Sequence, residues 1–314
     1  GVKRALGGSG ALTDALVRLI GEHGGEVHAA TPVRRIVVEG GRAVGVEVAE
    51  GAEPGLPLGA APPPPAGPTR RVAARAVLAG CHVATTFGRL LADAPEAAEM
   101  RERVAKLRVG NGFGMILRCA TSELPAYAGA PADGSPGPMH MGLQLLCPPA
   151  PFLDHAYADF ARGEPARDPA VVAMTWTAVD PSLAPAGKHL LFAWAQYHPY
   201  ALAGGATWDD VREREAERIL AAVGRFAPNV PGCVERVHVQ TPADLERELG
   251  LHNGNVMHLE MSLDQMFFFR PVPELAQYRT PVGGLFLTGA STHPGGGVFG
   301  ASGRSAAQVV LHAL

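Results

Sequence analysis

A glycine-rich segment near the end of the chain constrains the fold more than any other stretch. Residues 284–289 read Gly-Leu-Phe-Leu-Thr-Gly, and this apolar run between glycines predicts a short buried strand. Six glycines follow within residues 289–303, and residues 301–311 fit a helix packed on a sheet. Glycine lets a ligand approach the backbone, and a helix N-terminus presents N–H groups and a positive dipole end. The segment therefore predicts a site for a polyanion or an electron-rich ring edge.

The same residues also fit a tight strand-to-helix connection that binds nothing. The segment lacks the GxxxxGK[ST] pattern of a phosphate-binding loop, and a motif is a hypothesis until its structural context is seen. Spacing alone leaves both interpretations open. A Ser-His-Asp hydrolase is excluded, because the chain has no GxSxG nucleophile elbow.

Composition narrows the classes of partner. With 314 residues, 47% of them hydrophobic and 18% charged, the chain can bury a core large enough for two lobes. The formal net charge is −3 and no dense basic tract is present, which argues against nucleic acid as a partner. The four cysteines are far apart and no apolar run is long enough to span a membrane. We therefore expect reduced thiols and a cytoplasmic location.

Hydrophobic periodicity and turn residues predict the elements along the chain. The Pro-, Gly- and Ala-rich residues 51–69 predict a flexible exposed loop at a hairpin end. Helices are predicted over residues 11–23, 92–106 and 207–226, and over a short stretch that starts at Pro242. Ser9 is the predicted cap of the first helix, a Thr207–Asp210 capping box begins the third, and Thr241 caps the last. Predicted strands are the hairpin 33–39 and 43–48, the stretch 71–79, the antiparallel set 113–118, 139–146, 171–178 and 189–197, and finally 234–239.

The string LFLTGASTHPGGGVFGASGRSAA, residues 285–307, resembles the C-terminal flavin-binding segment of the phytoene desaturase-like FAD-dependent oxidoreductases. The nearest branch is the one that contains pyridine nucleotide-disulfide oxidoreductase domain-containing protein 2. The resemblance covers nearly the whole chain and is specific in about the last seventy residues, which include Pro242-Ala-Asp-Leu-Glu-Arg-Glu-Leu-Gly250 and Gly254-Asn-Val-Met-His258.

This resemblance implies a mixed α/β and α+β fold. An incomplete FAD/NAD(P)-binding Rossmann-like domain would accompany a substrate domain built on an antiparallel sheet with helices. Residues 1–107 would form part of the FAD-binding domain with its hairpin insertion, and residues 108–270 the substrate-binding domain. Residues 271–314 would supply the C-terminal strand, loop and helix that bind FAD.

The resemblance also implies FAD as the cofactor and assigns the residues that contact it. Val33 would contact the adenine through its backbone. His293 is expected to orient the loop through a backbone bond. The other expected FAD-binding positions are Gly289, Ala290, Ser291, Thr292, His293, Gly295, Gly296, Gly297, Val298, Phe299 and Gly300.

A second group of polar residues precedes this segment. The resemblance places Asn255 and His258 near the substrate. His258 is therefore the candidate catalytic residue, which would polarise the substrate or exchange a proton with it. A hydrogen-bonded structural histidine is the alternative. His252 and His258 match no recognised metal-ligand spacing, and no metal site is predicted. Arg270 and Asp264 are expected to pair around the glycine-rich loop.

Aromatic residues collect in the predicted substrate lobe, at Trp176, Phe192, Trp194 and Tyr197. Most are expected in the core, with one or two lining a pocket for an apolar substrate. Flavoproteins of this class hold the FAD pyrophosphate on a GxGxxG turn in an N-terminal βαβ unit, and none precedes the hairpin here. We therefore expect the C-terminal portion of a longer enzyme, or a short form that borrows the other half or has lost the cofactor.

Two functions follow as hypotheses. The first is an FAD-dependent oxidoreductase that dehydrogenates or isomerises an apolar substrate, with a phytoene-type carotenoid desaturase or isomerase as a narrower alternative. The second is a non-catalytic binding module that pairs with another protein. The expected partners are an apolar small molecule, a membrane surface contacted peripherally, a second copy of the chain, or a missing N-terminal half.

Overall fold

The computed structural model describes residues 4–49 and 68–314, which cluster into two compact units. Gly1–Val27 and Asn111–Asp244 form the sheet unit, and His28–Gly110 with Leu245–Leu314 form the loop unit. Each unit is therefore built from two separate stretches of sequence. No helix in the described ranges has the length and apolar character needed to cross a bilayer.

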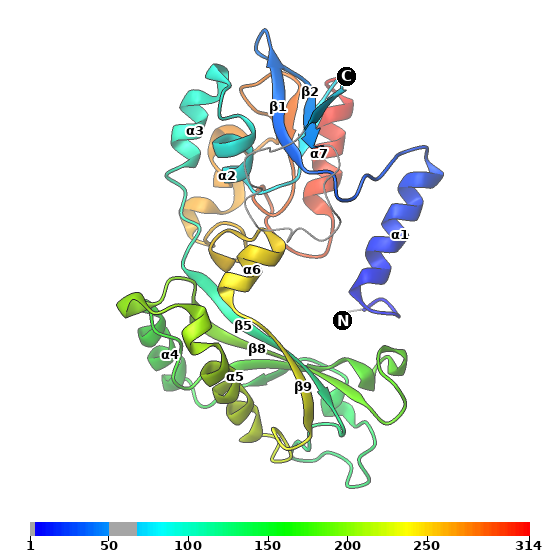
Figure 1. Cartoon of the computed structure of the whole chain (residues 1–314), viewed down its shortest axis with the longest axis vertical. Coiled ribbons are helices and arrows are strands. Elements are labelled where there is room, and N and C mark those ends of the chain that lie inside the picture. The colour runs from blue at the N-terminus through cyan, green and yellow to red at the C-terminus, as the bar shows by residue number, and fades with distance from the viewer. Residues whose placement is uncertain (1–3, 50–67) are drawn as a thin grey trace. The chain divides into compact units, whose positions relative to one another are not determined.

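The sheet unit is built on a five-stranded antiparallel sheet in the order β6-β7-β8-β5-β9 (Figure 1). The two longest strands pair with Leu117 opposite Ala193, and alternate residues such as Leu117 and Leu191 are buried on one face. This period-two pattern is the one expected of a sheet with one face packed on a core. The strands are β5 Gly112–Thr121, β6 Gln144–Leu146, β7 Val171–Thr175, β8 His189–Pro199 and β9 Val234–Gln240.

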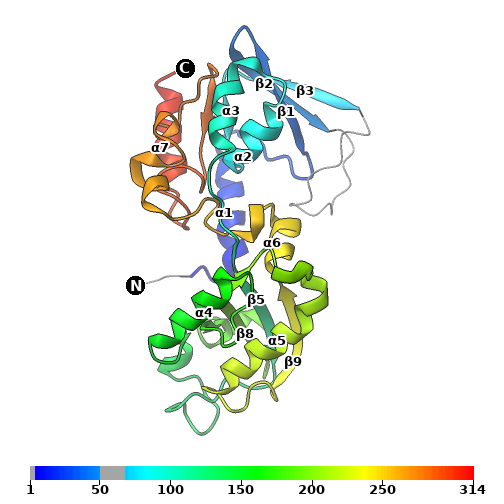
Figure 2. The ribbon, with the colours of Figure 1, turned by 90° about the vertical axis from the view of Figure 1, so that its left-hand side faces the viewer.

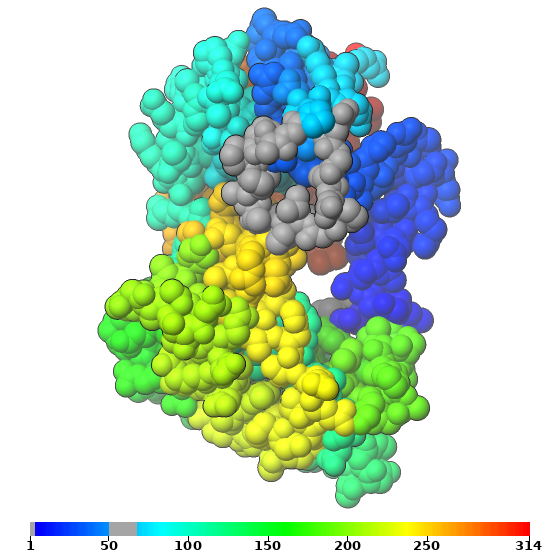
Figure 3. Space-filling model, viewed as in Figure 1, coloured from blue at the N-terminus to red at the C-terminus, as the bar shows by residue number. Residues whose placement is uncertain are grey.

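Helix α5, Trp208–Gly224, covers the buried face of this sheet (Figures 1 and 2). Its N-terminus has the predicted capping box, because Thr207 Oγ1 accepts the N–H of Asp210 and Asp210 accepts the N–H of Thr207. Ile219 and Val223 point into the core, whereas Glu213, Arg214 and Glu217 are exposed. The part of the chain that includes α5 is yellow-green in the space-filling view of Figure 3. The unit also contains α4, Pro151–Ala161.

Helix α1, Ser9–Glu22, also belongs to the sheet unit. It begins one residue after Gly8, so Gly8 is the N-cap and Ser9 is the first helical residue, which corrects the predicted cap. Its apolar residues, including Leu12 and Leu16, are exposed, and none of its residues is buried. The helix therefore forms from its local pattern rather than from burial.

The loop unit combines a hairpin sheet with a parallel pair of strands. The predicted hairpin is confirmed, and a third strand adds to it in the order β1-β2-β3. The predicted buried strand before the glycine-rich loop is also confirmed as β10, which pairs in parallel with β4. The strands are β1 Val33–Glu39, β2 Arg42–Ala49, β3 Thr69–Ala73, β4 Val77–Ala79 and β10 Leu285–Leu287.

Helices and short helical turns surround these strands. The core between these helices, turns and strands contains the fully buried side chains of Phe87, Leu259 and Leu285. The α-helices are α2 Val83–Thr85, α3 Ala98–Val104, α6 Pro242–Leu249, which crosses the unit boundary, and α7 Ala301–Leu311; Thr86–Leu90 is a π-helical turn. The 3-10 turns of the two units are Pro95–Ala97, Pro138–His140, Trp176–Ala178, Pro181–Leu183, Ala203–Gly205, His252–Gly254, Leu263–Gln265, Phe267–Phe269 and Pro273–Leu275.

Several predicted elements differ in extent. The stretch 71–79 breaks into β3 and β4, because the chain leaves the antiparallel hairpin to join the parallel pair. The stretch 139–146 is a strand only at its end, because buried His140 bonds the Pro125 carbonyl and the Gly137 N–H within a 3-10 turn. The helix predicted over 92–106 is shortened to α3, and most of the predicted 51–69 loop lies outside the described residues.

The two units also divide the sequence differently from the prediction. Residues 1–27 group with the sheet unit, where the Gly7 N–H donates to Asp180 Oδ2 at 2.7 Å. Residues 245–270 group with the loop unit, where Arg270 donates to the Ala290 carbonyl. The predicted boundary at 107/108 is close to the observed one after Gly110.

We predict that Leu117→Ala lowers the free energy of unfolding of the sheet unit by about 2–5 kcal/mol, because it removes a fully buried side chain and leaves a cavity. Urea denaturation followed by circular dichroism measures the change. Leu145→Ala is the matched control, since Leu145 lies in the same sheet but is 62% exposed. An equal effect of the two substitutions would contradict this account of the core.

Candidate functional site

The glycine-rich loop, residues 288–300, connects β10 to α7 and begins at a place where only glycine fits. Gly289 has a φ of 90°, and a Cβ at this position would lie 2.8 Å from the Gly80 carbonyl oxygen. Both the dihedral angle and the close approach exclude a side chain. The Thr288 N–H donates to the Ala79 carbonyl at 2.9 Å, so the loop leaves directly from the parallel strand pair.

The far end of the loop exposes backbone at the start of α7. Gly300 is the N-cap with a left-handed φ of 65°, and no side chain caps the helix. Val298 and Phe299 are 91% and 57% exposed. The first N–H groups of α7 therefore have no intrahelical partner. They lie next to the exposed end of the glycine-rich loop, where a ligand can approach the backbone.

A buried arginine anchors the near end of the loop. Arg270 is 1% exposed, and its Nε and Nη2 donate to the Ala290 carbonyl at 3.1 and 2.8 Å. The same side chain donates to the carbonyls of Met257 at 2.6 Å and Gln265 at 3.2 Å. Burial lowers the pKa of Arg270 from its ordinary value. The guanidinium thus joins three backbone segments through carbonyl oxygens.

The predicted pair of Arg270 with Asp264 is therefore wrong. Asp264 instead accepts two hydrogen bonds from Arg108 Nη2 at 2.7 and 2.9 Å. These two side chains are exposed, whereas Arg270 points into the interior, where the loop carbonyls need donors. Sequence proximity suggested the pair, but burial separates the two residues.

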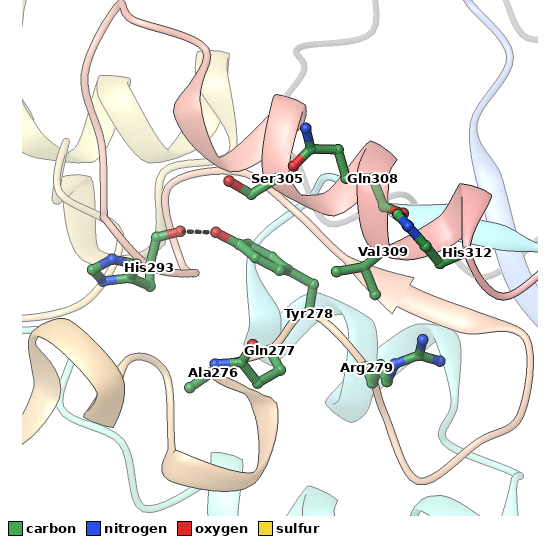
Figure 4. Close-up of a pocket in the computed structure, with 9 residues that line it drawn as sticks. All are labelled: Ala276, Gln277, Tyr278, Arg279, His293, Ser305, Gln308, Val309 and His312. Atoms are coloured by element: carbon green, nitrogen blue, oxygen red, sulfur yellow. Dashed lines mark hydrogen bonds between the residues drawn. The ribbon is translucent and has the colours of Figure 1, made fainter.

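The orienting role predicted for His293 stays a prediction, because its ring Nδ1 is buried and has no hydrogen-bond partner within the described residues. Tyr278 donates its hydroxyl to the His293 carbonyl at 2.9 Å, as Figure 4 shows. Tyr278 lies in a pocket of about 440 Å³ between residues 276–279 and α7, which contributes Ser305, Gln308, Val309 and His312. The loop is thus held from two sides, by Arg270 at Ala290 and by Tyr278 at His293.

Three histidines gather beside the loop, although the sequence indicated a role for only one of them. The rings of His82 and His252 have centroids 4.2 Å apart, and those of His82 and His258 are 5.2 Å apart. His252 Nε2 is hydrogen-bonded to Thr85 Oγ1 at 2.9 Å. His82 is the N-cap of α2 and Thr85 is its last residue. This short helix follows β4, and it brings both residues next to a segment that is far away in sequence.

His258 contacts the glycine-rich loop directly. Its Nδ1 lies 3.1 Å from Ser291 Oγ, which also accepts the Val83 N–H at 3.1 Å. The His258 backbone has a φ of 64°, and its carbonyl oxygen lies 2.9 Å from His82 Nε2. The predicted catalytic histidine is therefore joined by hydrogen bonds to the segment that was predicted to bind FAD.

Burial disfavours the charged form of all three histidines. Burial lowers the pKa of His258 to about 4, and the positive charge of Arg270 lowers it further. Burial also lowers the pKa of His82 to about 4, although its bond to the His258 carbonyl opposes this. The pKa of His252 is lowered by burial as well. A neutral imidazole can donate from one nitrogen and accept at the other.

Other predicted residues have structural contacts of their own. Ser291 and Thr292 are buried, and Thr292 Oγ1 donates to the Gly289 carbonyl at 2.8 Å, so only their backbone remains for a ligand. Asn255 is also buried and accepts the Met257 N–H at 2.8 Å, so it orders its own turn. Val33 begins β1 and packs against the core of the loop unit, and its predicted contact with adenine stays a prediction.

The open face of the sheet in the other unit is aromatic. Trp176, Phe192 and Trp194 are half-buried, which differs from the core position expected for most of them. The rings of Trp176 and Phe192 are 6.0 Å apart, and those of Phe113 and Trp194 are 5.3 Å apart. Alternation along β8 explains the positions of Phe192 and Trp194, because Leu191 and Ala193 pack in the core with α5 and the residues between them face the other side. We call these four residues the aromatic face.

The chain was compared with known proteins. No family model matches it. It is 34% identical over 313 residues to pyridine nucleotide-disulfide oxidoreductase domain-containing protein 2 of Rattus norvegicus, covering 98% of this chain and 51% of that protein. It is 26% identical over 300 residues to a neurosporene-forming phytoene desaturase of Rhodobacter capsulatus, covering 95% of this chain and 51% of that protein. The chain thus spans about half the length of the curated relatives it matches.

A crystal structure of an oxidoreductase from Methanosarcina mazei has the same fold. The TM-score is 0.57 at 19% sequence identity, and the match covers 98% of this chain and 55% of the other. The expected mixture of helices with antiparallel sheets is thereby confirmed.

We predict that Arg270→Ala lowers the free energy of unfolding of the loop unit by at least ~2 kcal/mol, because buried carbonyls lose their donors. Amide hydrogen exchange in residues 288–300 should also become faster. Urea denaturation and exchange mass spectrometry measure these effects. Arg89→Ala, at an exposed arginine of the same unit, is the control, and a loop that exchanges equally slowly in both variants would contradict the anchoring role.

We further predict that stability falls as the pH falls from about 6.5 to about 4. His82 and His258 have an ordinary pKa of 6.5 and a folded pKa of about 4, so the unfolded chain binds more protons within this window. Each histidine adds a slope of up to ~1.4 kcal/mol per pH unit. Urea denaturation at several pH values measures the slope. His82→Gln should flatten it and exposed His155→Gln should not, whereas an unchanged slope in His82→Gln would refute the assignment.

Proposed function

Because the chain is a homologue of the phytoene desaturase-like oxidoreductases, we propose that it forms part of an FAD-dependent oxidoreductase. The observation that carries this proposal is the strand–loop–helix segment, in which an anchored glycine-rich loop leads into a helix without a side-chain cap. Such a segment offers backbone N–H groups to an electron-rich ring edge. The bound flavin supplies the acceptor for a hydride.

The residues present fit this cofactor. Gly295, Gly296 and Gly297 have no side chain to block an approach, and the exposed Val298 and Phe299 flank the entry to α7. We propose that the backbone of Gly289–Gly300 holds the ring edge. Arg270 and Tyr278 would keep this backbone in place before the cofactor arrives, so that little ordering is needed on binding.

We propose that His258 is the polar side chain that meets the reacting groups. It lies beside the loop, is neutral, and is hydrogen-bonded through Nδ1 to Ser291. A neutral imidazole can donate or accept one hydrogen bond without the cost of a buried charge. His82 and His252 would limit the positions open to its ring.

We propose an apolar substrate that binds on the aromatic face of the sheet unit. Phe113, Trp176, Phe192 and Trp194 are half-buried, and ligand sites are largely apolar with few polar groups. Arg4 is stacked on Trp176 with its guanidinium carbon 3.7 Å from the ring centroid. One relative is named for phytoene, which is a hydrocarbon, and this supports the same substrate class.

A second candidate function is a module completed by another polypeptide. The observation that favours it is the parallel pair β4 and β10, which has no third strand within the described ranges. Leu78 of β4 is exposed, although parallel strands are ordinarily covered on both faces. We propose that further strands from a partner, either a second copy or a separate N-terminal half, add to this pair.

We predict that the purified chain retains an absorbance band of bound flavin after FAD is added and free flavin is removed. Gly296→Val should weaken FAD binding at least tenfold, because its branched side chain would stand where the cofactor approaches the loop backbone. The fold should tolerate the substitution, because a Cβ at this position would make only ordinary contacts with its neighbours. Gly142→Val is the matched control in the sheet unit. Titration of flavin fluorescence measures the affinity, and circular dichroism checks the fold. Equal affinity in both variants would contradict a flavin at this loop.

A further inference from the structure

The hydroxyl of Ser291 determines which nitrogen of His258 carries the proton. Ser291 is 1% exposed, and its Oγ accepts the Val83 N–H at 3.1 Å. A backbone N–H can only donate, so this bond occupies one lone pair of the hydroxyl. The remaining neighbour within hydrogen-bonding distance is His258 Nδ1, at 3.1 Å. In the part of the chain that the structure describes, the Ser291 hydroxyl makes no other hydrogen bond.

Two arrangements of protons are conceivable, and burial separates them. If His258 Nδ1 carried the proton, it would donate to Ser291 Oγ and leave the hydroxyl hydrogen buried without an acceptor. A buried polar hydrogen without a partner is unfavourable. If the hydroxyl donates to Nδ1, both Ser291 and Nδ1 are satisfied and the proton of the neutral imidazole resides on Nε2. The second arrangement satisfies every buried atom.

The main chain of His258 is held independently of its ring. The Ala84 N–H donates to His82 Nδ1 at 3.1 Å, so the proton of the neutral His82 ring resides on its Nε2. That nitrogen donates to the His258 carbonyl at 2.9 Å. The backbone of His258 therefore keeps its positive φ while Ser291 orients the ring. The Nε2 of His258 makes no hydrogen bond within the described residues and is not sealed off from solvent.

We propose that Ser291 is a positioning residue that fixes His258 as the tautomer with hydrogen on Nε2, so that His258 is a hydrogen-bond donor and not a general base. The identity of the acceptor rests on the function proposed above. A hydrocarbon has no acceptor atom, so with an apolar substrate the Nε2–H would donate to water in the free protein and, once FAD is bound, to an oxygen or nitrogen at the edge of the flavin ring. The network itself does not depend on FAD, because all of its members belong to this chain.

Nitrogen-15 NMR of the chain labelled at histidine tests the tautomer directly. At pH 7 we expect His258 to show a protonated-type shift at Nε2 and an unprotonated-type shift at Nδ1, with the signals assigned by their loss in His258→Gln. Ser291→Ala should give a mixture of the two tautomers, and Ser291→Thr, which keeps the hydroxyl, should restore the single form. Ser135→Ala, at an exposed serine of the sheet unit, should change nothing.

The proposal is overturned if His258 carries its proton on Nδ1, or if Ser291→Ala leaves a single Nε2–H form. Thermal unfolding of each variant shows whether the fold is retained. Adding FAD separates the two claims. A shift of the His258 Nε2 signal in a sample that retains flavin supports the donor role, and retention without a shift refutes it. A sample that retains no flavin contradicts the proposed function, while the tautomer result still decides the role of Ser291.

Discussion

The hydrogen bonds of one buried guanidinium organise the loop unit. Arg270 reaches the carbonyls of Met257, Gln265 and Ala290, and so joins the histidine segment, the turn after it and the start of the glycine-rich loop. Buried arginines usually face a carboxylate, but backbone carbonyls can also accept hydrogen bonds from the fork of donors. A loop this rich in glycine has much conformational freedom to lose. Donors that bind its carbonyl groups therefore determine which conformation it takes.

The same burial determines the chemistry of the neighbouring histidines. Burial of His82 and His258 opposes their protonation, and the positive charge of Arg270 opposes a second cation nearby. The group is thus a set of neutral donors and acceptors arranged around Ser291. This agrees with the FAD-dependent role proposed above, in which the protein would contribute orientation and hydrogen bonds and the cofactor the reactive ring.

The two units provide surfaces of different character. The loop unit presents backbone and neutral imidazoles, whereas the sheet unit presents the aromatic face. In the sheet unit the division arises from strand alternation, because Leu191 and Ala193 pack beneath α5 while Phe192 and Trp194 point to the opposite side. The polar segment proposed to hold a cofactor and the apolar surface proposed to bind a hydrocarbon therefore come from separate parts of the sequence.

Local patterns in the sequence determined the elements that carry the site. The apolar triplet 285–287, the glycines after it and the helix from Ala301 were predictable, because a short-range pattern specifies a strand, a flexible turn and a helix. The hairpin and the capping box at Thr207 followed for the same reason. The partners of Arg270 did not, and sequence proximity suggested Asp264 instead.

The histidine group was equally inaccessible to sequence reasoning, which indicated only His258. His82 follows β4, and Ser291 follows β10, so it is the parallel pairing of two distant strands that brings both to His258. No periodicity encodes contacts between residues separated by more than 150 positions. The sequence by itself determined which backbone segments form, whereas the tertiary structure alone decided which buried donors and acceptors meet, because each had to find a partner once water was excluded.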